Sequence, residues 1–142
     1  MKSPGAAKQI TIFIGLVVKN NKILMVQRNE PEVPDAHLKW EFPGGKVEIG
    51  EAPEEAIVRE LKEETGVAVE VKGLMPCVVS TDWNYPWGRQ HTIILGFECK
   101  FLTEEKREKD HKVEDVEWIL LDEVLARETM PSVKVFLKAL SS

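Results

Sequence analysis

The chain has 142 residues, of which 43% are hydrophobic, so its length and apolar content suit one compact domain over residues 1–142. Its formal net charge of −5 argues against binding to a nucleic-acid polymer, because such binding needs a basic surface that neutralises phosphates. Its two cysteines form neither a CxxC motif nor a paired framework, which favours a reduced, cytoplasmic protein.

The first elements expected are two strands joined by a tight turn. Ile10 to Val18 and Lys22 to Arg28 are β-branched, apolar runs, and Lys19-Asn20-Asn21 between them predicts a β-hairpin. The first run is too short to cross a bilayer, and the N-terminal residues lack the pattern of a secretion signal, so we expect no membrane partner. A loop from Asn29 to Lys39 then leads to a short strand at Trp40 to Phe42.

A helix is expected next, with clear signals at both ends. Pro43-Gly44-Gly45 breaks the preceding strand and allows a close backbone approach to a ligand. Pro53 suits the first turn of a helix, and Gly66 suits its left-handed C-terminal cap. We therefore expect the helix between these two residues.

Three glutamates share one face of this helix. At about 100° per residue, Glu63 and Glu64 lie about 60° and about 40° to either side of Glu60. Like charges at this spacing repel, so the row favours a bound cation, and Mg²⁺ or Mn²⁺ prefers such oxygen ligands. A solvated surface is the alternative. The neighbouring apolar stripe expected to be buried consists of Ile57, Val58 and Leu61.

The C-terminal half predicts more sheet and a final helix. The expected elements are strands at Val67 to Ser80, His91 to Phe101 and Val116 to Leu121, and an amphipathic helix from about Pro131 to Leu140. An aromatic loop, Asp82 to Gln90, would join the first two strands, and a charged connection, Thr103 to Asp115, would precede the third. This order predicts an α+β fold in which helices cover a mixed sheet.

The spacing around the glutamates is more specific than the helix face alone. It runs Gly45, five residues, Glu51, seven residues, Arg59-Glu60-Leu61, one residue, Glu63-Glu64, one residue, Gly66-Val67. This resembles the Nudix box with every defined position filled, over residues 45–67, and the preceding Trp40 to Gly45 is similar to MutT-type members of that family. The resemblance implies a Nudix-type α/β/α sandwich with a mixed β-sheet.

The resemblance also implies an activity, namely Mg²⁺-dependent hydrolysis of a nucleoside diphosphate linked to another group, with Mn²⁺ as a substitute ion. A MutT-like member would cleave a nucleoside triphosphate, including oxidised deoxynucleotides, to a monophosphate and pyrophosphate. Cleavage of ADP-ribose or another nucleoside diphosphate derivative is the alternative within the family. A non-catalytic module that senses nucleotides is the alternative of another class.

Family roles can be carried onto matching positions of this chain. The resemblance implies that Glu60, Glu63 and Glu64 hold the metal and activate water, with the carbonyl of Gly44 as a further ligand. Arg59 and Glu51 look like the supporting pair that orients these carboxylates, although a surface ion pair is the alternative. A further metal carboxylate is implied in the late connection, where the candidates are Asp110, Glu114 and Asp115.

Substrate contacts are implied less specifically. The candidates for substrate binding are Arg28, Glu41, Phe42, Gly44, Gly45 and Arg89. Trp83 and Trp87 could stack on a base, cap the core or meet a partner subunit, and a homodimer is compatible with such a surface. MutT reads oxidised guanine with an asparagine before the last helix, whereas Ser132 stands there in this chain and lacks an amide's paired donor and acceptor.

Overall fold

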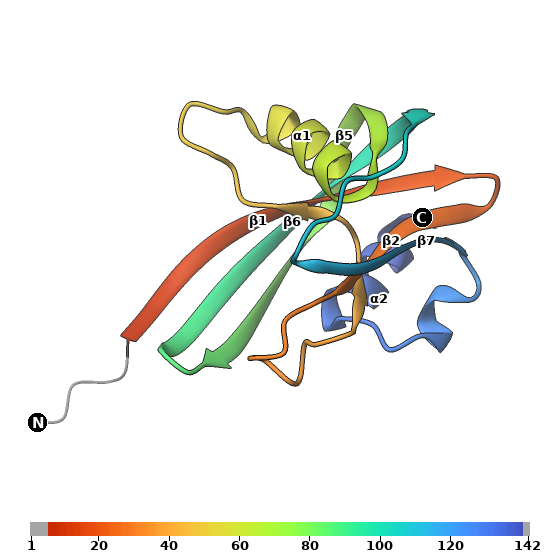
Figure 1. Cartoon of the computed structure of the whole chain (residues 1–142). Coiled ribbons are helices and arrows are strands. Elements are labelled where there is room, and N and C mark those ends of the chain that lie inside the picture. Colours follow the sequence, from red (N-terminus) through yellow and green to blue (C-terminus); the bar gives the residue numbers. More distant parts are fainter. Residues whose placement is uncertain (1–5, 141–142) are drawn as a thin grey trace, which may run out of the picture.

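The computed structural model describes residues 6–140 and shows a mixed sheet flanked by helices (Figure 1). Its elements in chain order are β1 (Ala6–Lys19), β2 (Lys22–Arg28), β3 (Trp40–Glu41), β4 (Gly44–Gly45), α1 (Pro53–Thr65), β5 (Val67–Tyr85), β6 (Gly88–Glu104), β7 (Val113–Leu120), the 3₁₀ turn η1 (Val124–Ala126) and α2 (Pro131–Leu140).

The sheet is organised around β1. This strand runs parallel to β6 from the Ala6–Gly88 pair to the Val17–Cys99 pair, and at its far end it pairs antiparallel with β2. β6 pairs antiparallel with β5, and β2 pairs antiparallel with β3 and β7, which gives the order β3-β2-β1-β6-β5 with β7 against β2 and β4 against β1. Asn20 and Asn21 have φ angles of 52° and 62°, so the predicted hairpin turn is confirmed.

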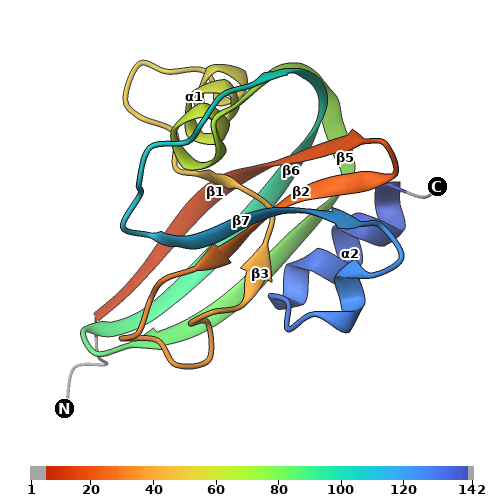
Figure 2. The ribbon, with the colours of Figure 1, turned by 45° about the vertical axis from the view of Figure 1, so that its right-hand side comes forward.

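The two helices cover opposite faces of the sheet, as Figures 1 and 2 show. The glycines of the central strands explain how closely they pack. A Cβ on Gly15 would lie 2.9 Å from Leu61 of α1, whereas a Cβ on Gly96 would lie 2.8 Å from Phe136 of α2. Each helix therefore closes its own apolar core, and the predicted α+β sandwich with a mixed sheet is confirmed.

The ends of α1 follow from its sequence. Pro53 opens the helix, the Glu55 carboxylate accepts a hydrogen bond from the Ala52 N–H at 3.0 Å, and Gly66 closes it with a φ of 79°. Ile57 and Leu61 are fully buried as expected. The expectation that Val58 joins them was wrong, because Val58 is 39% exposed.

The predicted aromatic loop between Asp82 and Gln90 was also wrong. β5 continues to Tyr85 and β6 begins at Gly88, so only Pro86 and Trp87 remain as a turn. The reason is that β6 has a partner on each side here: it pairs with β5 and also with the start of β1. The sheet satisfies backbone groups that a loop would expose to water.

Two smaller corrections concern backbone pairing. Gly44 and Gly45 do more than interrupt a strand, since they form β4 against Ile14 and Phe13 of β1. The charged connection is shorter than expected, because β6 extends to Glu104 and β7 already begins at Val113. Within residues 6–140, no helix is both long enough and apolar enough to cross a membrane.

Candidate active site

Arg59 is the centre of a carboxylate cluster on α1. Its Nε donates to Glu51 Oε2 at 2.7 Å and its Nη2 to Glu51 Oε1 at 3.0 Å. Its Nη1 donates to Glu60 Oε1 at 3.0 Å and to Glu63 Oε2 at 3.3 Å. Because one planar guanidinium contacts all three carboxylates, it fixes their relative positions.

Glu64 is held separately, beneath the turn that precedes α1. Its side chain is 8% exposed, and Oε1 accepts a hydrogen bond from the Gly44 N–H at 2.9 Å. Burial raises the pKa of Glu64 well above its usual range, against the lowering effect of the Gly44 bond, and the charges of Glu60, Glu41 and Asp110 raise it further.

Gly45 lets the turn lie directly on Glu60. A Cβ at this position would be 2.8 Å from the carboxyl carbon of Glu60. A side chain would therefore push the carboxylate aside. Burial also raises the pKa of Glu60, partly offset by its hydrogen bond from Arg59.

These groups suit a divalent cation. Carboxylate and carbonyl oxygens are the ligands that Mg²⁺ and Mn²⁺ prefer, and a cation would compensate the buried carboxylate of Glu64. In the arrangement described, no three Asp, Glu, His or Cys side chains among residues 6–140 are gathered closely enough to hold a metal. Arg59 forms ion pairs with both Glu60 and Glu63. The side chain of Glu63 is 55% exposed, so it has room to turn away from Arg59.

The late connection contributes charge near the same carboxylates. Asp110 acts on Glu64, and Lys112 acts on Glu60. Asp110 Oδ1 accepts a hydrogen bond from the Lys112 N–H at 2.9 Å, and Asp115 Oδ1 accepts one from the Val116 N–H at 2.8 Å. Of the three candidates for a further metal carboxylate, Asp110 is the one whose charge raises the pKa of Glu64.

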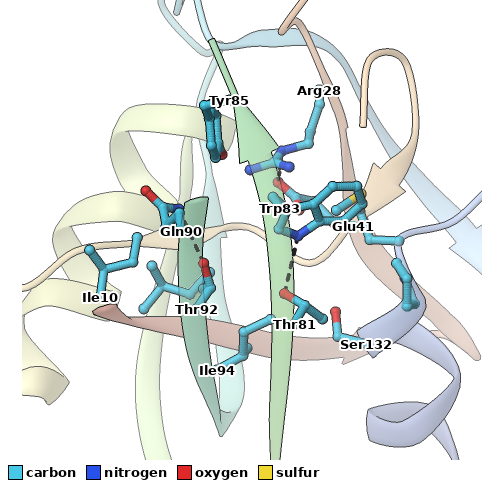
Figure 3. Close-up of a pocket in the computed structure, with 13 residues that line it drawn as sticks. Ile10, Arg28, Glu41, Thr81, Trp83, Tyr85, Gln90, Thr92, Ile94 and Ser132 are labelled. Atoms are coloured by element: carbon cyan, nitrogen blue, oxygen red, sulfur yellow. Dashed lines mark hydrogen bonds and ion pairs between the residues drawn. The ribbon is translucent and has the colours of Figure 1, made fainter. Parts of the chain in front are cut away.

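A cleft lies between the sheet and the start of α2 (Figure 3). It has a volume of about 70 Å³ and opens to solvent. Its lining residues are Ile10, Ile12, Arg28, Glu41, Thr81, Trp83, Tyr85, Gln90, Thr92, Ile94, Met130, Pro131 and Ser132. Aromatic and aliphatic walls with a few buried polar groups are typical of a site for a planar organic ligand.

The family model for the NUDIX domain matches residues 9–140. The chain belongs to the Nudix family. The 8-oxo-dGTP diphosphatase of Escherichia coli is 45% identical over 62 residues, which are 42% of this chain and 46% of that protein. The ADP-ribose pyrophosphatase of Methanocaldococcus jannaschii is 41% identical over 83 residues, which are 58% of this chain and 46% of that protein. The chain thus spans less than half the length of these curated relatives.

Solved structures agree with this assignment. The MutT NUDIX hydrolase of Burkholderia pseudomallei superposes with a TM-score of 0.77 at 26% identity, covering 94% of this chain and 98% of that one. The Nudix domain of Shewanella oneidensis NrtR, crystallised with ADP-ribose, superposes with a TM-score of 0.67 at 20% identity over 94% of this chain and 87% of that one. The predicted resemblance to MutT-like Nudix proteins is confirmed.

Arg59 brings Glu51, Glu60 and Glu63 together, whereas Glu64 is held by Gly44 instead. The substrate-binding candidates separate. Arg28 and Glu41 line the cleft, where Arg28 Nε lies 3.1 Å from Glu41 Oε1 and Nη1 lies 3.5 Å from Glu30 Oε1. Burial raises the pKa of Glu41, although Arg28 lowers it. Since two carboxylates already neutralise Arg28, it is less suited to a substrate phosphate than an unpaired arginine would be.

Two other candidates lie outside the cleft. Phe42 is a core residue that packs edge-to-face on Phe136, with ring centroids 6.3 Å apart. Arg89 projects from the opposite face of β6 to Gln90, is 65% exposed and pairs with Asp82 at 3.2 Å. Neither side chain is among those that line the cleft.

The aromatic residues divide between two environments. Trp83 and Tyr85 line the cleft, whereas Trp87 is 44% exposed and stacks on Tyr85. Sequence reasoning missed Gln90 and Thr92 as cleft residues. Their alternation with Arg89 and His91 would have indicated one shared face, had the segment been identified as a strand.

Proposed function

We propose that this Nudix domain catalyses the metal-dependent hydrolysis of a nucleoside triphosphate to a nucleoside monophosphate and pyrophosphate. The observation that carries the proposal is the Arg59 cluster of Glu51, Glu60 and Glu63, completed by Glu64 against Gly44. It provides oxygen ligands for a divalent ion, and a cleft with aromatic and aliphatic walls, lined in part by Glu41, lies within electrostatic range of Glu64.

The base and the phosphates of such a substrate would contact different parts of the protein. The cleft offers apolar walls for a base, from Ile10, Ile12 and Trp83. The phosphates would lie at the turn before α1, where Gly44 and Gly45 bring the backbone next to Glu64 and Glu60. Glu41 lines the cleft and also acts electrostatically on Glu64, so the two parts adjoin each other.

The residues of the site would have separate roles in binding the ion, accepting a proton and orienting the carboxylates. When bound, Mg²⁺ or Mn²⁺ neutralises phosphate charge and lowers the pKa of water. Glu60, Glu63, Glu64 and Asp110 would hold the ion, together with the carbonyl of Gly44, and a carboxylate of this set would accept the proton of the attacking water. Arg59 and Glu51 would orient the carboxylates without touching substrate.

The proposal also covers the cellular compartment, the type of substrate and the oligomeric state. We propose one Nudix domain over residues 1–142, acting in the cytoplasm on free nucleotides and not on nucleic-acid polymers, with homodimerisation compatible with the exposed β5 edge. The free cysteines Cys77 and Cys99 and the net charge of −5 support a reduced setting and small-molecule substrates.

Product analysis tests the activity. The protein is incubated with Mg²⁺ and, separately, each of ATP, CTP, GTP, UTP, 8-oxo-dGTP and ADP-ribose, and products are separated by anion exchange. We expect monophosphate and pyrophosphate in equal amounts, without orthophosphate, and no turnover with EDTA. Release of orthophosphate with a diphosphate would contradict the proposal.

The same panel separates the alternatives. A higher kcat/KM for ADP-ribose than for every triphosphate would favour the activity for which the Methanocaldococcus relative is named. Tight nucleotide binding without turnover in Mg²⁺ or Mn²⁺ would favour a nucleotide-sensing module instead.

A further inference from the structure

We propose that Gln90 is a specificity-determining residue whose side-chain carbonyl accepts a hydrogen bond from an exocyclic amino group of the substrate base. The protein would then prefer amino bases, adenine and cytosine, over the matching keto bases, hypoxanthine and uracil. This inference rests on the proposed nucleotide hydrolysis and names the base chemistry that the cleft recognises.

Three of the buried polar side chains lie in the cleft. Among residues 6–140, the buried polar or charged side chains are Glu64, Thr65, Gln90, Thr92 and Ser132. Thr65 caps α1, since its hydroxyl donates to the Leu61 carbonyl and accepts from the Val67 N–H. Glu64 belongs to the carboxylate site. The other three all line the cleft, where they supply polar groups that a ligand could meet.

Gln90 has the most to offer a ligand. It is 9% exposed, and its Nε2 donates to Thr92 Oγ1 at 3.1 Å. The buried side-chain atoms that lack a hydrogen-bond partner among residues 6–140 are Glu30 Oε1 and Arg107 Nη1, so Gln90 Oε1 is not an orphaned core atom. Because Thr92 holds the nitrogen, the oxygen remains available to accept a hydrogen bond in the cleft.

The surroundings favour a flat, largely apolar ligand. In Figure 3, Gln90 and Thr92 lie beside Tyr85 and Trp83 on the adjacent strand, with Ile10 below Gln90. The Trp83 indole is already engaged, because its Nε1 donates to Thr81 Oγ1 at 3.1 Å. Gln90 thus contributes an amide to a cleft whose other walls include rings and aliphatic groups.

The hydrogen-bonding groups of the bases explain why Gln90 Oε1 would favour amino bases. The amino groups of adenine and cytosine are donors, whereas the corresponding oxygens of hypoxanthine and uracil are acceptors that would face Oε1. One neutral hydrogen bond changes affinity by roughly 2- to 13-fold. We expect kcat/KM to be about 10-fold higher for ATP than for ITP, and about 10-fold higher for CTP than for UTP. This value lies in the upper part of the range for one hydrogen bond.

The test compares these two ratios in wild type, Gln90→Leu and Gln90→Glu. Leucine removes the acceptor, so both ratios should fall to near unity. Glutamate keeps an acceptor and removes the donor, so both ratios should stay at or above the wild-type values. Because each ratio is measured on one enzyme preparation, a change in the folded fraction cancels. Gln9→Leu is the matched control, since Gln9 is exposed on β1 beside His91, and it should leave the ratios unchanged.

Each contrary outcome has a distinct meaning. Ratios near unity or in favour of the keto bases in wild type would overturn the role of Gln90. Wild-type ratios retained in Gln90→Leu would also overturn it. Absence of turnover for all four nucleotides in wild type would instead contradict the proposed function itself.

Discussion

Arg59 binds Glu51 with two nearly parallel hydrogen bonds, from Nε at 2.7 Å and from Nη2 at 3.0 Å. Glu51 precedes α1 and Arg59 lies within it, so this pair fixes the connection before the helix to the helix itself. The same hydrogen bond lowers the pKa of Glu51, which keeps the partner ionised. The third guanidinium nitrogen is left to hold Glu60 and Glu63.

The first prediction concerns the contacts of Arg59 with Glu51 and Glu60. Arg59→Lys keeps the charge but cannot bind Glu51 and Glu60 at once, because lysine has a single ammonium group. We expect kcat to fall about 10- to 100-fold while the melting temperature changes little. Steady-state kinetics on the best triphosphate measure the effect. Arg127→Lys, at a surface pair with Glu117, is the control and should retain activity.

The second prediction concerns the glutamates of the Nudix box. Glu63→Gln or Glu64→Gln keeps side-chain size but removes the negative charge that would hold a divalent ion. Each should lower kcat by at least about 100-fold without unfolding the protein. Glu54→Gln, exposed on the same helix, should retain wild-type kcat. Wild-type turnover in both of the first two variants would disprove their metal role.

The third prediction uses the glycine turn. A Cβ at Gly45 meets the Glu60 carboxyl group, so Gly45→Ala should reduce kcat at least about 10-fold by displacing that carboxylate. A Cβ at Gly73 has nothing within 4 Å, which makes Gly73→Ala the matched control. Equal activity of the two alanine variants would show that the turn does not need to contact Glu60.

The fourth prediction concerns pH and the buried thiol. Cys99 is 5% exposed, and burial raises the pKa of its thiol from 9.0 to about 12. Because the folded pKa is the higher, stability is fully present below pH 9 and is lost as pH rises toward 12. At pH 10 this thiol should lower the free energy of unfolding by about 1.4 kcal/mol.

Urea unfolding at pH 8 and pH 10 measures this loss, and Cys99→Val should show less of it than wild type. Cys77 is partly exposed, and burial raises its pKa as well, so Cys77→Val is the comparison and should change the pH dependence less. An identical loss of stability in wild type and Cys99→Val would contradict the prediction.

Local patterns predicted much of this fold. Pro53 and Gly66 bound α1, and Asn20-Asn21 forms the first turn, because each depends on backbone preferences of its own few residues. The segment from Asp82 to Gln90 could not be placed in this way. Its conformation depends on β1, which joins β6 from more than 80 positions away in the chain.

The sequence by itself determined the family and the carboxylates of the Nudix box, because one helix sets the spacing of Arg59, Glu60, Glu63 and Glu64. Only the tertiary structure decided what surrounds them. It brings the charge of Asp110 to bear on Glu64, pairs Arg28 with Glu41, turns Arg89 away from the cleft and brings Gln90 into it. These relationships depend on strand pairing between distant segments, and the direction in which each side chain points follows from the register of that pairing.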